Sequence, residues 1–181
     1  GFYALYALLS AGLLGMTITG DMFNLYVFLE IASISGYGLI ALGGDKSVMA
    51  SFRYLLLGTI AASFYLLAVA YMYSITGTLN MADMAMLLAS HKNSPNVFIA
   101  VSMLIIAFGI KMALFPLPGW QPDAYTYAHP AAAPLIAGLM SKAPALAMLR
   151  YMFYIIGADS PYVAKALTVI GFLGACGIIR G

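Results

Sequence analysis

Residues 96–123 read NVFIAVSMLIIAFGIKMALFPLPGWQPD, an apolar run with one lysine that then meets three prolines within seven residues. A helix that crosses a bilayer needs roughly 20 predominantly apolar residues, and the run from Asn96 to Leu114 has about that length. Each proline removes a backbone N–H, and its ring clashes with the preceding turn, so a regular helix cannot continue through Phe115–Asp123. The stretch therefore predicts a membrane helix that breaks just after Lys111.

The whole chain has the same apolar character. Hydrophobic residues make up 64% of the 181 residues and charged residues only 8%, whereas an ordinary soluble domain has about 25% charged residues. The net charge of +2, without any basic cluster, gives no sign of a nucleic-acid partner. The single cysteine, Cys176, gives neither a disulfide framework nor a metal-ligand pattern. Composition thus favours an integral membrane protein.

Six apolar segments follow one another along the chain, at about 2–17, 22–42, 49–75, 96–114, 130–156 and 161–181. Residues 81–89 are apolar but too short to span, so we expect an amphipathic helix at the membrane interface, capped by Asn80 and followed by a polar connection at 91–95. Gly58 and Ala62 have the spacing that lets a neighbouring helix approach closely.

The predicted fold is an all-α polytopic membrane bundle of about six transmembrane helices, one of them broken by prolines, forming a single unit over residues 1–181. Because the chain starts without Met inside an apolar run, we expect a part of a longer subunit.

Three ionisable residues fall inside these spans: Glu30, Lys111 and Lys142. A charge at the bilayer centre costs about 2.5–3.5 kcal/mol on insertion scales, so these charges must be compensated within the bundle. We expect Glu30 to pair with a lysine, which offsets much of the desolvation.

The prolines add polar backbone groups near the two lysines. Pro116 and Pro118 withhold their N–H groups from the carbonyls one turn earlier, so a helix that ends there directs unpaired carbonyls and its negative dipole end toward Lys111. Pro144 likewise frees the carbonyl of Met140, one turn below Lys142. Broken helices of this kind build ion sites in transporters.

Lysine suits proton transfer because a buried lysine can release its proton, whereas arginine stays charged. Making or breaking a Glu–Lys pair would then switch a lysine between holding and releasing a proton. Each of the three residues also has a plainer interpretation. Lys111 and Lys142 can be structural lysines, the former snorkelling to the interface, and Glu30 can serve a purely structural hydrogen bond.

Secondary candidates carry weaker arguments. Arg53 is typical of a charge near a helix end, with an ion-path role as the alternative. Asp123 either braces the proline loop or admits protons. His129 is interpreted as a loop or helix-start residue, with a relay role as the alternative. The two histidines of the chain are far apart and neither lies in mid-span, which disfavours a haem or metal enzyme.

Three motifs together resemble one family. GDMFNLYVFLE (residues 20–30) is similar to the glutamate-bearing helix of the antiporter-like subunits found in respiratory complex I, membrane-bound hydrogenases and Mrp-type sodium/proton antiporters. KMALFPLPGWQPD (residues 111–123) resembles the broken-helix motif of that family, and LMSKAPALAMLR (residues 139–150) its next helix with a relay lysine. The resemblance covers most of the chain.

The resemblance implies a subunit of about fourteen helices in two inverted repeats, of which this chain supplies one repeat and the first helix of the next. It implies that Glu30 and Lys111 form the ion pair that gates a half-channel and that Lys142 is the onward relay. Two family histidines are replaced here by Tyr125 and Ala137, and a family glycine by Pro144. The resemblance therefore leaves Ser141, Thr126, His129 or water to stand in for the histidines.

The resulting function hypothesis is proton, or sodium/proton, translocation across a membrane as a subunit of a respiratory or antiporter complex. The rival hypothesis is a non-conducting structural subunit of such a complex. We expect this chain to catalyse no chemical reaction and to bind no cofactor. If it belongs to a redox-driven translocase, other subunits would carry the redox reaction and its cofactors. The expected partners are the lipid bilayer, other membrane subunits, H⁺ and Na⁺, in a prokaryotic inner membrane.

Overall fold

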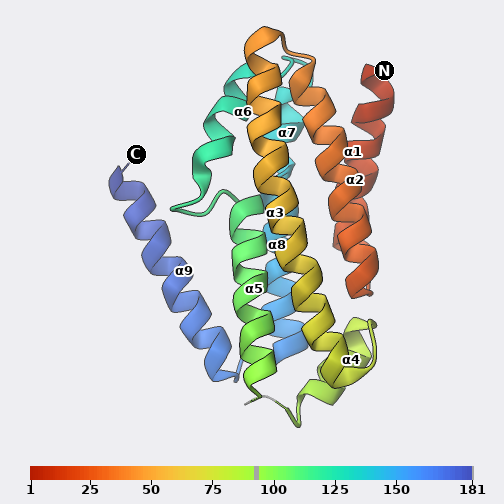
Figure 1. The fold of residues 1–181 in the computed structure, drawn as a ribbon, viewed down its shortest axis with the longest axis vertical. Coiled ribbons are helices and arrows are strands. Elements are labelled where there is room, and N and C mark those ends of the chain that lie inside the picture. The colour runs from red at the N-terminus through yellow and green to blue at the C-terminus, as the bar shows by residue number, and fades with distance from the viewer. Residues whose placement is uncertain (92–93, 181) are drawn as a thin grey trace.

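The computed structural model describes residues 1–91 and 94–180 and is helical throughout (Figure 1). Lys92 and Asn93, part of the expected connection at 91–95, lie outside the described residues. The elements run in the order α1 (Phe2–Ile18), α2 (Met22–Ala41), α3 (Asp45–Thr76), α4 (Met81–Leu88), α5 (Pro95–Lys111), η1 (Pro118–Trp120), α6 (Gln121–Tyr127), α7 (Ala133–Leu139), α8 (Lys142–Arg150), the π-helix η2 (Tyr151–Gly157) and α9 (Pro161–Arg180). The all-α prediction is confirmed.

Most of the predicted spans correspond to helices of the bundle. Among the described residues, three helices are long and apolar enough to cross a membrane, at Met22–Ala41, Asp45–Thr76 and Pro161–Ile179, and two shorter apolar helices, α1 and α5, stand beside them. The third span begins at Asp45, four residues earlier than predicted, and the fourth ends at Lys111 instead of Leu114. The fifth predicted span, over residues 130–156, is divided into α7, α8 and η2.

Helices α1 and α2 pack closely against each other. A Cβ atom at Gly12 would lie 2.7 Å from the backbone nitrogen of Ala32 and 2.8 Å from the carbonyl oxygen of Phe28. Since real Cβ atoms do not come this close to backbone, only glycine lets the two helices approach to this distance. The predicted small residue on α3 acts in the same way, because a Cβ atom at Gly58 would collide with the Tyr37 hydroxyl of α2.

The starts of α2 and α4 are joined at one end of the bundle, at the bottom of Figure 1. Met22 N donates to the carbonyl of Leu79, and Met81 N donates to the carbonyl of Gly20, both at 2.9 Å. The Asp21 carboxylate caps α2, and the Asn80 side chain accepts from Ala82 N at 2.9 Å and so caps α4, as predicted. This connection holds the short α4 across the end of the bundle.

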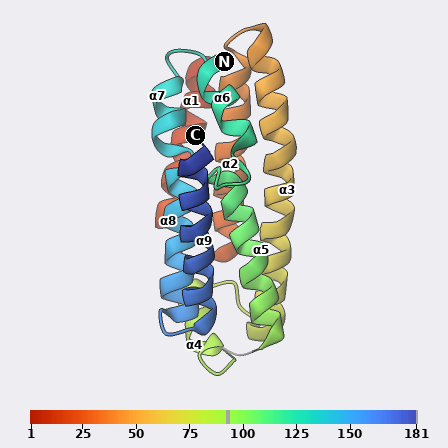
Figure 2. The ribbon, with the colours of Figure 1, turned by 90° about the vertical axis from the view of Figure 1, so that its left-hand side faces the viewer.

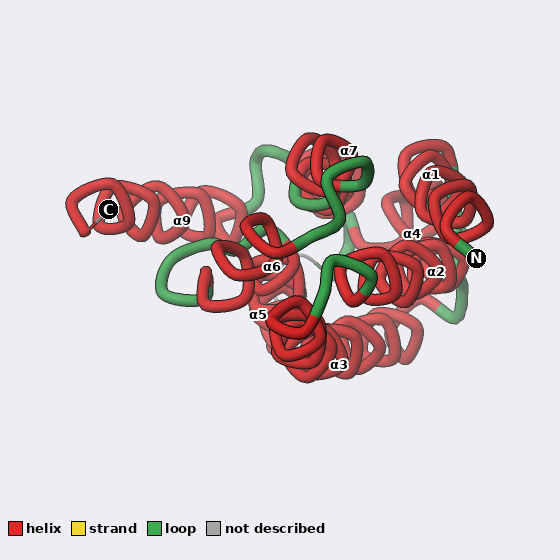
Figure 3. The backbone as a smooth tube through the Cα atoms, turned by 90° about the horizontal axis from the view of Figure 1, so that it is seen from above, coloured by secondary structure: helices red, strands yellow, loops and turns green. Residues whose placement is uncertain are grey.

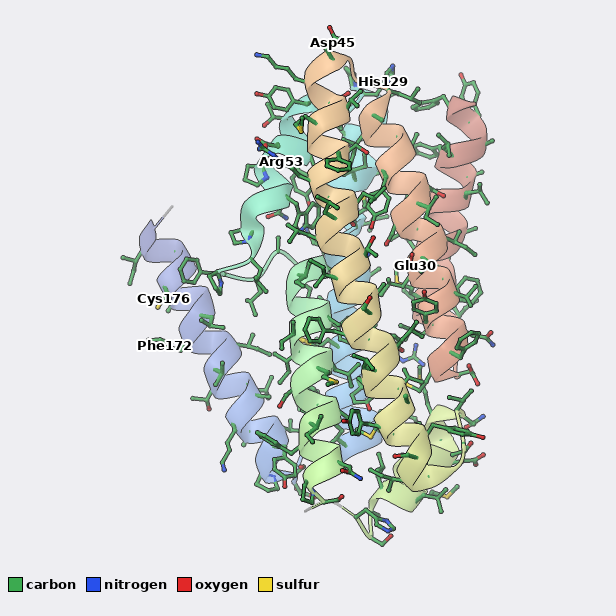
Figure 4. The ribbon with its side chains drawn as sticks, viewed as in Figure 1. Glu30, Asp45, Arg53, His129, Phe172 and Cys176 are labelled. Carbon is green, nitrogen blue, oxygen red and sulfur yellow. The ribbon has the colours of Figure 1, made fainter. Side chains whose placement is uncertain are left out.

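Helix α9 leaves the bundle after its first turns. Viewed from above, it stands to one side of the other helices (Figure 3). Only 11% of the apolar stretch that could cross a membrane is buried against the rest of the protein. Val163 and Ala166 near its start are buried. Phe172 and Cys176 lie on the diverging part (Figure 4), and Cys176 is a half-buried free thiol.

Candidate functional site

The carbonyl groups at the end of α5 are bound within the protein. Met112 N donates to the carbonyl of Phe108 at 2.7 Å, and Leu114 N donates to that of Gly109 at 2.8 Å. The indole Nε1 of Trp120 reaches back to the carbonyl of Ile110 at 2.7 Å. The predicted break is confirmed, since Pro116 lies in the irregular link and Pro118 begins η1. Of the two carbonyls that Pro116 and Pro118 were predicted to leave unpaired, those of Met112 and Leu114, the carbonyl of Leu114 accepts from Leu117 N at 2.7 Å.

Trp120 fixes the broken segment against the bundle. The side chain is fully buried, and its ring stacks on Tyr54 of α3 with centroids 3.9 Å apart. Tyr54 in turn meets the Tyr37 ring edge-on at 4.7 Å. A row of aromatic rings therefore runs from the proline-broken segment through α3 to α2, next to the last residue of α5.

Lys111 is the last residue of α5 and points into the bundle. It is only 2% exposed, and its Nζ donates to the Ser33 hydroxyl of α2 at 2.6 Å. The ammonium also lies 5.9 Å and 5.8 Å from the ring centroids of Tyr37 and Tyr54, within the range of cation–π attraction. A snorkelling lysine would extend to the interface; this side chain turns to the core.

Glu30 lies on α2 one turn before Ser33, inside the bundle (Figure 4). Its Oε1 is buried and has no hydrogen-bond partner within the chain. Glu30 is near enough to Lys111 for their charges to interact, but the predicted direct ion pair is not formed. Within residues 1–91 and 94–180, the ion pair found at 4 Å or less joins Arg53 and Asp123. The reason is geometric: Ser33 shares the face of α2 with Glu30 at i+3, and its hydroxyl takes the ammonium.

A small cavity adjoins Lys111 and Ser33. Its volume is about 10 Å³, room for about one water molecule. Its walls come from α1, α2, α3, α5 and the α7–α8 region, namely Leu13, Met16, Leu29, Ala32, Ser33, Tyr54, Lys111, Met140 and Pro144. The cavity thus connects Lys111 with the break in the fifth span.

The break in the fifth span falls at Met140–Ser141, and α8 begins at Lys142 with Pro144 in its first turn. Lys142 is exposed, and its Nζ donates to the carbonyl of Ala137 at the end of α7, at 2.8 Å. It borders an apolar groove of about 340 Å³ between α1 and the α7–α8 pair. Ser141 is buried in the turn, where its side chain makes no cap hydrogen bond. The structure therefore places Lys142 beyond the cavity, separate from the Glu30–Lys111 cluster (Figure 2 shows α8 alongside α1).

The secondary candidates lie toward the opposite end of the bundle from α4 (Figure 4). Arg53 Nη1 donates to Asp123 Oδ2 at 2.7 Å, with side chains 59% and 37% exposed. The pair ties α3 to α6, which fits the interpretation of Asp123 as a brace and gives Arg53 a partner on another helix. His129 Nδ1 accepts from Ala131 N at 3.2 Å, which fits the predicted helix-start residue.

Sequence reasoning missed three residues of this site. Ser33 was detectable as a polar residue one turn after Glu30 on the same helix face. Trp120 stood in the broken-helix motif without an assigned contact. Tyr54 carried no local signal, because its role depends on a ring 66 positions away in the chain.

The sequence matches the family described as NADH:quinone oxidoreductase/Mrp antiporter, TM, over residues 19–178. It is 51% identical to NADH-quinone oxidoreductase subunit N of Desulforudis audaxviator over 180 residues, covering 99% of this chain and 36% of that protein. It is 35% identical to a Na(+)/H(+) antiporter subunit of Alkalihalophilus pseudofirmus, covering 98% of this chain and 37% of that protein. The fold is similar to a chain of the membrane-bound sulfane sulfur reductase, an archaeal respiratory membrane complex, with a TM-score of 0.85 and 38% identity over 92% of this chain and 34% of that one.

The chain spans just over a third of the length of these proteins. The family match, in contrast, covers most of the chain, from Thr19 to Ile178. The helices from α2 to α8, the broken span, Glu30 and Lys111 lie within the matched range, whereas α1 precedes it. The chain therefore belongs to the family of antiporter-like membrane subunits shared by NADH:quinone oxidoreductases and Mrp antiporters.

Proposed function

We propose that this chain carries protons, alone or in exchange for sodium, across a membrane as part of an ion-translocating subunit. One observation carries the proposal: a buried lysine, Lys111, rests on the Ser33 hydroxyl beside a buried glutamate oxygen without a partner. Burying two charged groups costs free energy that apolar residues of similar size would not. Intramembrane ionisable residues of this kind mark ion paths.

The cluster has the parts that a proton transfer needs. The lysine ammonium holds a proton and can release it. The Ser33 hydroxyl both accepts and donates, accepting from Lys111 at 2.6 Å and donating to the carbonyl of Leu29 at 2.7 Å. The one-water cavity then leads from Lys111 to the break before Lys142. We propose Glu30 and Lys111 as the exchanging pair and Lys142 as the onward site, with Ser141, Arg53, Asp123 and His129 in supporting roles.

The relatives support the wider setting of this proposal. One is a subunit of an NADH-quinone oxidoreductase and another a subunit of a Na(+)/H(+) antiporter. We propose that this chain likewise works in a multi-subunit complex of a prokaryotic inner membrane. It would contribute the ion path and hold no cofactor, while partner subunits supply the energy.

Replacing Glu30 with glutamine tests this function. Glutamine keeps the shape but cannot exchange a proton, so we expect proton uptake by the full-length subunit, in its complex in vesicles, to fall about ten-fold or more. Asp45→Asn, the same change at an exposed site at the start of α3, should leave uptake unchanged. Native uptake by an assembled Glu30→Gln complex would favour the rival hypothesis of a non-conducting structural subunit.

A further inference from the structure

Two buried side-chain atoms in the described part of the chain lack a hydrogen-bond partner: Glu30 Oε1 and the hydroxyl of Tyr151. The first belongs to the site described above. The second lies at the start of the π-helix η2, and Tyr151 is only 4% exposed. A buried hydroxyl without a partner costs about 1–3 kcal/mol, so an unpaired one in a folded protein points to a bound water or ion or to a functional role. Short π-helices are also frequent at functional sites.

Tyr151 does not stand alone. A second fully buried phenol, Tyr65 of α3, belongs to the same end of the bundle, where its hydroxyl donates to the carbonyl of Met22 at 2.9 Å. The Tyr65 ring stacks on Tyr26, with centroids 6.3 Å apart, and Tyr26 lies one turn before Glu30 on α2. Two phenols, from α2 and α3, therefore lie near the start of α2, and Tyr151 adds a third at the same end of the bundle.

The α2 residues involved form one stripe. Met22, Tyr26 and Glu30 are spaced four residues apart, so they lie above one another on one helix face. The eight residues from Met22 to Glu30 rise about 12 Å at 1.5 Å per residue. The stripe thus joins the α4 end of the bundle to Glu30, whose Oε1 is buried.

An open cavity lies at the outer end of this stripe. It has a volume of about 370 Å³ and is lined by Gly20, Asn80, Met81, Ala82, Arg150 and Tyr154, of which Arg150 directly precedes Tyr151. The Arg150 guanidinium donates to the carbonyls of Thr17 and Thr19, both at 2.8 Å. These carbonyls form the negative end of α1, which offsets part of the arginine charge. Asp21, the cap of α2, is the nearby acid.

We propose that Tyr151 and Tyr65 form a second buried hydration site, which connects Glu30 with the α4 end of the bundle and passes protons. A phenol hydroxyl donates one hydrogen bond and accepts others. It can therefore take a proton from water on one side and release its own to water on the other, with no net change in the phenol. Two phenols and one carbonyl offer too few oxygens for a dehydrated sodium ion, so the site takes water and protons. The hydration site stands on its own geometry, whereas its role as a route rests on the proposed function of Glu30.

Radiolytic footprinting of the full-length subunit in its complex tests the hydration site without any transport assay. Hydroxyl radicals formed from bound water modify the side chains next to it, so we expect modification of Tyr151 despite its burial. Tyr73, half exposed on α3, gives the reference rate for an accessible phenol. An unmodified Tyr151 beside a modified Tyr73 would overturn the hydration site.

Tyr151→Phe tests the route. Because the hydroxyl has no protein partner, its removal should leave the thermal stability of the complex unchanged or higher. We expect proton uptake to fall on the order of ten-fold. The fall should be smaller than the one caused by removing a fully positioned proton donor, because water can partly replace the hydroxyl. Tyr73→Phe should keep native uptake. Native uptake by Tyr151→Phe, in a protein whose uptake still depends on Glu30, would overturn the route and leave the proposed function standing.

Discussion

Lys111→Met should abolish proton uptake while the complex still assembles. Methionine fills a similar volume but holds no proton, and a positioned proton-transfer group contributes about 10²- to 10⁴-fold to a rate. We therefore expect uptake below about 1% of native in vesicles that carry the full-length subunit in its complex. The fold should tolerate the change because Ser33 keeps its hydrogen bond to the carbonyl of Leu29, and Glu30 can become neutral by binding a proton.

The control for this variant is Lys165→Met, the same change at an exposed position of α9. Its uptake should equal that of the native complex. Subunit composition and thermal stability should be measured for both variants, so that a loss of uptake cannot come from a loss of assembly. Native uptake by an assembled Lys111→Met complex would make Lys111 a structural charge.

Trp120→Ala should cause the largest loss of stability. The indole is fully buried, stacks on Tyr54 at 3.9 Å and donates to the carbonyl of Ile110 at 2.7 Å. Truncation of a buried tryptophan to alanine costs about 3–5 kcal/mol, and here it also frees the last turn of α5, which carries Lys111. Thermal unfolding of the purified full-length subunit measures the effect.

Two further variants show what the indole contributes. Trp120→Phe keeps most of the ring stacking and loses the hydrogen bond to Ile110, so we expect an intermediate loss of about 1–3 kcal/mol. Phe172→Ala removes an exposed ring from α9 and should leave the unfolding temperature unchanged. Equal stabilities for native protein and Trp120→Ala would contradict the packing described for the broken segment.

The sequence predicted those features that depend on local patterns. Apolar runs located α2, α3 and α9, the side chain of Asn80 predicted the cap of α4, and three closely spaced prolines predicted the break after Lys111. Hydropathy failed in the fifth span, because an apolar run looks the same whether its backbone is continuous or interrupted. Pro144 marked the neighbourhood of that interruption but not its position at Met140–Ser141.

Contacts between distant positions were beyond local patterns. Arg53 and Asp123 are 70 residues apart, and only the fold shows that they meet. The hydrogen-bond partner of Lys111 could not be predicted from the sequence either. Glu30 and Ser33 lie on the same face of α2, and the ammonium of Lys111 donates to the Ser33 hydroxyl. The Tyr151 hydroxyl is notable only because the packing leaves it without a partner.

The most direct test of the central claim is proton uptake by the Lys111→Arg variant of the full-length complex. Arginine keeps the positive charge and can still donate to Ser33, but it does not release its proton. If Lys111 takes up and releases protons, the assembled Lys111→Arg complex should show no uptake above that of Lys111→Met. Native uptake by Lys111→Arg would show that only the charge matters, and proton exchange at this position would be contradicted.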